Sequence, residues 1–134
     1  MPESPLAPRD RVLLVLRVWG TYLLVRVVER RRPLIEVTAR LGRPPRRLPA
    51  RHSTARLSRA VDACLWPVGR PPRCLFSSLV LYRLLRAQGD APELVIGLEA
   101  EARHRLAHAW IELAGIDVGP FPGKGTNVPL GRYG

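Results

Sequence analysis

The sequence predicts an α+β domain in which several helices precede a small antiparallel sheet. Apolar residues recur at three- and four-residue spacing through residues 54–66 and 74–88, as they do along one face of a helix. From residue 94 onward the pattern changes to short apolar runs separated by glycine, which is typical of strands joined by turns. Helices followed by consecutive strands are characteristic of the α+β class.

The N-terminal part of the chain is predicted to be helical. A first helix is expected over residues 9–32, where Pro33 ends it, and a short second helix over residues 34–41. Residues 42–49 are predicted to be a linker, since closely spaced prolines prevent both helix and sheet hydrogen bonding.

The C-terminal part carries the remaining elements, and the helix over residues 74–88 is the clearest of them, with Gly89 as its stop. The strands are expected at residues 94–98, at residues 106–113 and from residue 118 onward. Gly115 is expected in the turn between the last two strands, and residues 119–125 in an irregular Gly/Pro-rich end.

A chain of 134 residues fits a single domain, which we divide into an N-terminal helical segment with its linker (9–50) and a core (54–134). The formal net charge is 22 − 11 = +11, and Lys124 is the one lysine among the basic residues. Such a charge predicts an acidic partner, a nucleic acid or an anionic membrane surface. Basic strips at residues 30–32 and 43–51 are the predicted contact regions.

Residues 12–28 are strongly apolar, but they include Arg17 and Arg26 and are shorter than the roughly 20 residues of a bilayer span. We therefore expect a helix that packs on the core or on a partner, with peripheral contact to a membrane surface as the alternative. The chain is expected to be cytoplasmic, with both cysteines reduced.

Cys74 is the first candidate for chemistry, because it follows two prolines and opens the long helix. The free N–H groups of a helix N-terminus stabilise a thiolate and can also stabilise an oxyanion. Cys64 lies on an apolar helix face and is expected to be a core residue. Two cysteines without a CxxC pair predict neither a disulfide framework nor a zinc site, and no cofactor is expected.

His108 is the second candidate. Strand parity places it on one face with Trp110 and Glu112, and a histidine beside a Cys-bearing helix start is how Cys–His pairs are built. A structural histidine is the alternative reading. His104, between two arginines, and His52, in the linker, are expected at the surface.

These residues resemble the transglutaminase-like leader peptidases of lasso-peptide biosynthesis. The similarity covers roughly residues 57–119 and is carried by the sequences RCL, SLVLYRLL and ELVIG and by AHAWIEL at residues 107–113. The combination of CLxxSLVLYRLL with AHAWIEL is specific, whereas neither half alone is. The resemblance implies a papain/transglutaminase-like core, Cys74 as the nucleophile and His108 as the general base.

The resemblance also implies a function. Such proteins remove the leader from a ribosomally made precursor peptide, after which a separate cyclase forms a macrolactam. A separate leader-recognition protein is an implied partner, and the macrolactam cyclase is a further candidate partner.

One position departs from the family pattern. The orienting carboxylate of the family lies twelve residues after the histidine, where this chain has Pro120, and the nearest acid is Asp117. A two-residue turn would place Asp117 opposite Glu112, about 13 Å along the strand from His108, whereas a longer turn would bring it closer. We therefore predict Asp117 as a candidate third catalytic residue. A backbone or amide partner, an unaided pair or loss of activity are the alternatives.

Two other functions compete with the peptidase. A nucleic-acid binder would explain the charge, but the sequence has no recognition motif of that kind. A non-catalytic peptide-binding or scaffold member of the same fold would explain Pro120.

Overall fold

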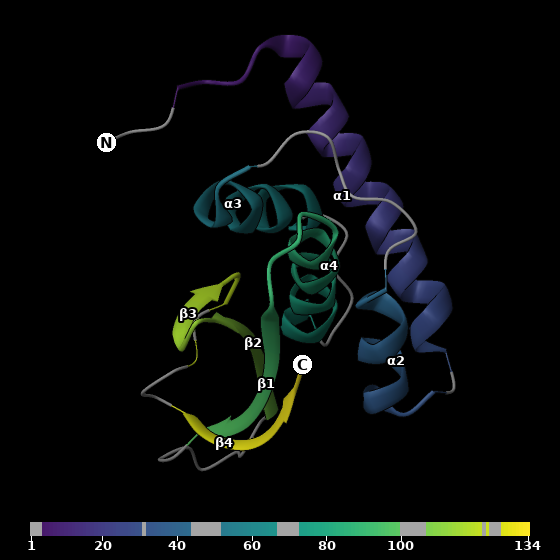
Figure 1. The fold of residues 1–134 in the computed structure, drawn as a ribbon, viewed down its shortest axis with the longest axis vertical. Coiled ribbons are helices and arrows are strands. Elements are labelled where there is room, and N and C mark those ends of the chain that lie inside the picture. The colour runs from purple at the N-terminus through teal and green to yellow at the C-terminus, as the bar shows by residue number, and fades with distance from the viewer. Residues whose placement is uncertain are drawn as a thin grey trace.

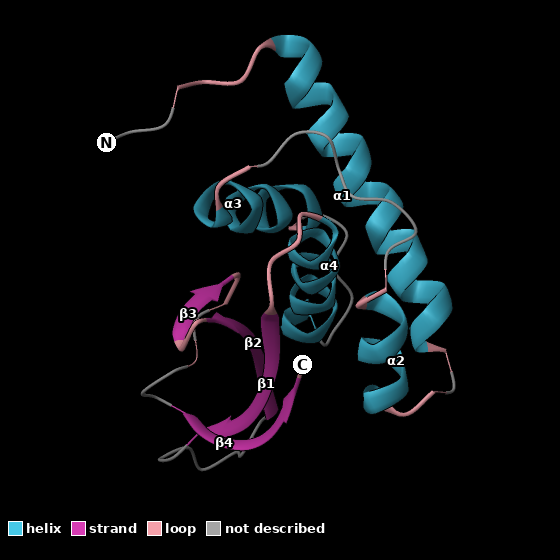
Figure 2. Ribbon diagram, in the orientation of Figure 1, coloured by secondary structure: helices cyan, strands magenta, loops and turns pink. Residues whose placement is uncertain are grey.

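The computed structural model describes residues 4–30, 32–43, 52–66, 73–99, 107–121, 123 and 127–134. Within these residues four helices precede a four-stranded antiparallel sheet, which confirms the predicted α+β class (Figures 1 and 2). The elements are α1 (Pro8–Glu29), α2 (Leu34–Leu41), α3 (Thr54–Leu65), α4 (Arg73–Ala87), β1 (Pro92–Glu99), β2 (Ala107–Leu113), β3 (Ile116–Gly119) and β4 (Asn127–Tyr133).

Helix α4 lies at the centre of the fold. Figure 1 shows it between the sheet and the other helices, and it packs against α1, α2 and α3 as well as against β1 and β2. Its residues from Phe76 to Tyr82 are all buried, because neighbours cover the helix on more than one side. A helix that is buried in this way cannot shift without disturbing the core, so its N-terminal end is held firmly.

The sheet has the order β3-β2-β1-β4. Strands β1 and β2 pair without a break from Pro92↔Leu113 to Leu98↔Ala107. The predicted three-strand meander was incomplete, because β4 adds a fourth strand along β1. Pro129 and Gly131 obscure this strand in the sequence, and proline is tolerated there because β4 is an edge strand.

The turn between β2 and β3 has two residues, which is the shorter of the two turn lengths considered from the sequence. Ala114 and Gly115 form it with φ of 52° and 79°, which is the left-handed pair of a two-residue hairpin turn. Strand β3 consequently begins at Ile116, two residues before its predicted start. Helix α1 ends at Glu29, three residues before the predicted end of the first helix.

Helix α1 is apolar on two sides. The residues Leu14, Val18, Tyr22 and Val25 are buried, whereas Val12, Leu16, Leu23 and Val27 are exposed. In the part of the chain that the structure describes, no helix combines the length and the hydropathy needed to cross a bilayer.

Several predictions fall outside the described residues. They are residues 44–49 of the predicted linker, Arg31 and residues 44–51 of the two basic strips, and the surface position of His104.

Candidate active site

Cys74 is the second residue of α4, is half-buried and is not in a disulfide. The first backbone N–H groups of an α-helix have no partner within the helix, so they are available to an anion next to that end. The thiol therefore stands where both a thiolate and an oxyanion can be stabilised.

Cys74 and His108 line the same pocket, which has a volume of about 230 Å³. The other described residues around it come from α2, α4, β1, β2 and β4 and are mainly apolar: Leu34, Leu75, Ile96, Ala107, Ala109 and Tyr133. A cysteine and a histidine that line one mainly apolar pocket are the residue types required for nucleophilic attack on a peptide carbonyl.

A hydrogen bond fixes the register between the two elements that carry these residues. The buried Ser78 hydroxyl on α4 donates to the Ala109 carbonyl on β2 at 3.1 Å. Ser78 lies one helical turn after Cys74, and Ala109 directly follows His108. Ser78 is a site residue that was not predicted, although a serine within an apolar helix face is a signal for such a bond.

The His108 ring is held on two sides. Its Nε2 lies 2.8 Å from the Phe121 carbonyl oxygen, and the ring stacks on that of Trp110 with centroids 5.9 Å apart. A carbonyl oxygen can only accept, so Nε2 carries the proton and Nδ1 of the neutral ring has a free lone pair. A backbone carbonyl thus occupies the position of an orienting group.

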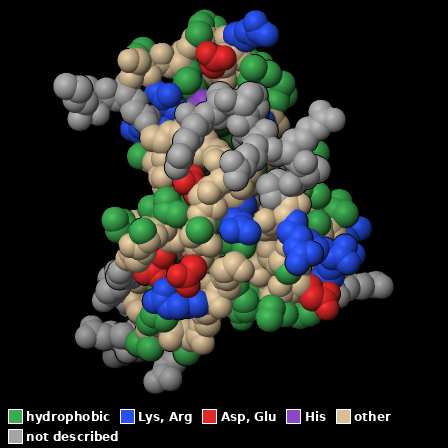
Figure 3. All heavy atoms as spheres, in the orientation of Figure 1, with side chains coloured by type: hydrophobic (Ala, Val, Ile, Leu, Met, Phe, Trp, Pro, Cys, Tyr) green, Lys and Arg blue, Asp and Glu red, His purple; other side chains and the backbone are tan. Residues whose placement is uncertain are grey.

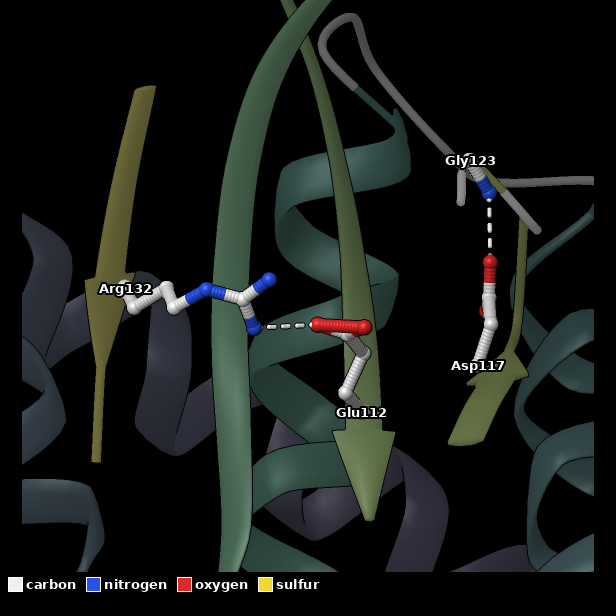
Figure 4. Close-up of polar contacts among 4 residues, drawn as sticks. All are labelled: Glu112, Asp117, Gly123 and Arg132. Carbon is white, nitrogen blue, oxygen red and sulfur yellow. Dashed lines mark hydrogen bonds and ion pairs between the residues drawn. The ribbon is translucent and has the colours of Figure 1, made fainter. Parts of the chain in front are cut away.

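Asp117 does not lie in the position of a direct partner of His108. It pairs with Glu112 in the sheet register, and its two carboxylate oxygens accept hydrogen bonds from the N–H groups of Gly119 and Gly123 at 2.9 and 2.7 Å. Figure 4 shows the Asp117 side chain directed at Gly123. Asp117 is also not among the described residues that line the pocket.

Glu112, on the same face of β2 as His108, is buried with its carboxylate 2.5 Å from the Arg132 guanidinium of β4 (Figure 4). This contact spans β1 and ties β4 to the centre of the sheet. It supports the strand that contributes Tyr133 to the pocket wall.

Helix α2, which supplies Leu34 to the pocket, is held at its opposite end by α4. Arg83 Nη1 donates to the Leu41 carbonyl and Arg86 Nε to the Gly42 carbonyl, both at 3.1 Å, and these are the groups that a helix C-terminus leaves unpaired. Burial lowers the pKa of Arg83, and it raises the pKa of the neighbouring Tyr82.

The remaining candidates lie elsewhere. Cys64 packs against the core from α3, and burial raises the pKa of its thiol, so it favours the protonated form. The predicted surface position of His52 was wrong, because this residue is half-buried and its backbone N–H donates to Gln88 Oε1 at 2.7 Å.

The described basic side chains do not form one continuous stripe on the face drawn in Figure 3, where they occur in separate groups with acidic side chains between them. A duplex-binding surface usually concentrates its basic residues on one face or along one helix.

The model of the Transglutaminase-like superfamily matches residues 18–126. This range includes α4, β1, β2 and β3 in full, together with Cys74 and His108. No curated protein and no solved structure matches the chain.

Proposed function

Because the chain belongs to the Transglutaminase-like superfamily, we propose that it is a cysteine peptidase that removes the leader from a ribosomally made lasso-peptide precursor. The observation that carries the proposal is the pocket shared by Cys74, at the start of α4, and His108, on β2. The transglutaminase-like fold commonly carries cysteine peptidase activity, and the similarity of residues 57–119 to leader peptidases supports the narrower assignment.

The reaction begins when Nδ1 of His108 accepts the proton of the Cys74 thiol. The thiolate attacks the carbonyl carbon of the scissile peptide bond, and the carbonyl oxygen becomes an oxyanion beside the first N–H groups of α4. The imidazolium then gives its proton to the leaving amine, which is the new N-terminus of the core peptide.

The leader now remains on Cys74 as a thioester. Water attacks the thioester carbonyl while Nδ1 of His108 accepts one proton, and the thiol is restored when that proton returns to sulfur. The products are a leader with a free carboxylate and a core peptide with a free amine.

The absence of an acid at position 120 is compatible with this chemistry. The Phe121 carbonyl is 2.8 Å from Nε2, so the ring has an acceptor that fixes its tautomer without a carboxylate. With its tautomer fixed in this way, the imidazole does not require a carboxylate at position 120.

The proposed partners are a separate leader-recognition protein and the macrolactam cyclase. A net charge of +11 fits an acidic partner or an acidic leader, and the exposed apolar residues of α1 are the proposed place for protein or membrane-surface contact.

The test uses the purified protein, a leader-recognition partner and a synthetic precursor, with products identified by mass spectrometry. Cys74→Ala should abolish cleavage, and the matched control Cys64→Ala should retain it. Equal cleavage by the wild type and Cys74→Ala would refute the proposal, as would a wild type that leaves every precursor offered with its partner intact.

A further inference from the structure

We propose that Asp117 is a positioning residue that acts on His108 through the segment carrying the Phe121 carbonyl. The assignment of a catalytic role to His108 rests on the proposed function, whereas the contacts themselves do not. This arrangement is neither a direct Asp117–His108 pair nor a Cys74–His108 pair that lacks an orienting group.

Two hydrogen bonds that the Asp117 carboxylate forms with described residues bracket Phe121. Oδ1 accepts from Gly119, two residues before Phe121, and Oδ2 accepts from Gly123, two residues after it. One side chain thereby holds a backbone N–H on either side of Phe121. Hydrogen bonds from backbone N–H to a carboxylate are among the stronger ones in proteins, because the acceptor is charged.

The same segment is pressed against the histidine. A Cβ added to Gly123 would lie 2.7 Å from Cδ2 of His108 and 2.4 Å from Cε3 of Trp110, so the backbone passes directly over both rings. The Gly123 carbonyl accepts from both the backbone N–H and the side-chain Nδ2 of Asn127 at 3.0 Å. Gly123 is therefore fixed through its N–H by Asp117 and through its carbonyl by the first residue of β4.

This arrangement explains how an acid that is remote in the sheet register can act on the base. Asp117 pairs with Glu112, four residues from His108, which is about 13 Å along a strand. The carboxylate itself orders the backbone, and the ordered carbonyl of Phe121 then selects the Nε2–H tautomer and leaves Nδ1 free for the thiol.

The experiment compares Asp117→Ala and Asp117→Asn with Glu93→Gln, which removes an exposed carboxylate from the same sheet. The ¹⁵N chemical shifts of the His108 ring, assigned by comparison with His108→Gln, report the tautomer without any need for activity. In parallel, kcat and KM are measured for cleavage of a synthetic precursor in the presence of the partner.

In the wild type and in Glu93→Gln we expect Nε2 to be protonated and Nδ1 to be unprotonated. In the Asp117 variants the two shifts should move toward each other as the tautomers mix, and kcat should fall about tenfold while KM changes by less than about twofold. A simple loss of folded protein would lower the active fraction without altering the shifts of the molecules that remain folded.

Unchanged His108 shifts and unchanged kcat in folded Asp117→Ala would overturn the proposal. If Asp117→Ala does not fold, the isosteric Asp117→Asn decides, and failure of both to fold would make Asp117 a purely structural residue. A wild type that shows the expected tautomer but cleaves nothing would refute the proposed function and leave the role of Asp117 in place.

Discussion

The Ser78 hydroxyl and the Ala109 carbonyl are joined by a buried hydrogen bond of 3.1 Å. Through this bond the helix that begins with the candidate nucleophile is fixed against the strand that carries the candidate base. The bond lies one turn from Cys74 and one residue from His108, so a small change there is transmitted to the pocket directly.

Ser78→Ala should weaken the contact that holds α4 in register with β2. The change leaves a buried carbonyl with one donor fewer, which costs about 1 kcal/mol of folding free energy, and we expect kcat to fall by more than the loss of folded protein explains. The matched control is Ser77→Ala, since Ser77 is also buried on α4 but forms no such bond with the described part of β2. Denaturant unfolding and steady-state kinetics measure both effects, and equal kcat in the two variants would contradict the prediction.

The two thiols should differ in their response to pH. Burial raises the pKa of Cys64, so its reactive thiolate forms only at a higher pH than in an ordinary cysteine. Iodoacetamide at neutral pH should therefore modify Cys74 first, and modification of Cys64 should increase as the pH is raised or the protein is unfolded. Peptide mapping by mass spectrometry measures the two rates. Equal rates of modification of Cys64 and Cys74 at pH 7 would contradict this prediction.

Gly123→Ala and Gly20→Ala should have opposite effects on stability. A Cβ at Gly123 would lie 2.4 Å from the Trp110 ring, which is completely buried and cannot move aside, so the segment must be displaced from His108. A Cβ at Gly20, within α1, meets nothing within 4 Å, and alanine is favoured over glycine in a helix by about 0.5–1 kcal/mol. Thermal unfolding should show a lower Tm for the first variant and a higher Tm for the second. Changes in Tm of the same sign for the two variants would be inconsistent with this packing.

Association with the proposed leader-recognition partner should weaken as salt is added. The chain carries a formal charge of +11, and attraction between exposed charges is screened beyond about 8 Å at physiological ionic strength. Calorimetric titrations between 0.05 and 0.5 M salt, a range of roughly 13 down to 4 Å in screening length, should show a rising Kd. Tight, sequence-selective binding to duplex DNA at physiological salt would favour the nucleic-acid alternative.

The local elements of this protein can be predicted from its sequence because their signals are local. Apolar spacing located α3 and α4, the break at Pro33 located the start of α2, and the apolar runs located β1 and β2, each to within two residues or fewer. Ala114 and Gly115 favoured the two-residue turn that the structure contains. The position of Cys74 at a helix start could be inferred in the same way, since prolines precede it.

Other features depend on pairing between distant parts of the chain. Strand β4 forms by pairing with β1 at the edge of the sheet, where Pro129 is tolerated. The sequence around that proline contains no strand pattern, so this strand could not be predicted locally. Likewise, the bond of Ser78 to Ala109 exists only once α4 lies against β2.

The sequence by itself determined which residues carry a thiol, an imidazole and a carboxylate, but it left open whether the turn at Ala114 and Gly115 brings Asp117 to His108. The structure shows that this turn is tight and that Asp117 pairs with Glu112 instead. Only the tertiary structure decided that a backbone carbonyl, that of Phe121, faces the imidazole in its place. The physical reason is that every residue has a carbonyl, so its identity carries no signal, and its direction is set by the folded backbone that Asp117 holds on either side of Phe121.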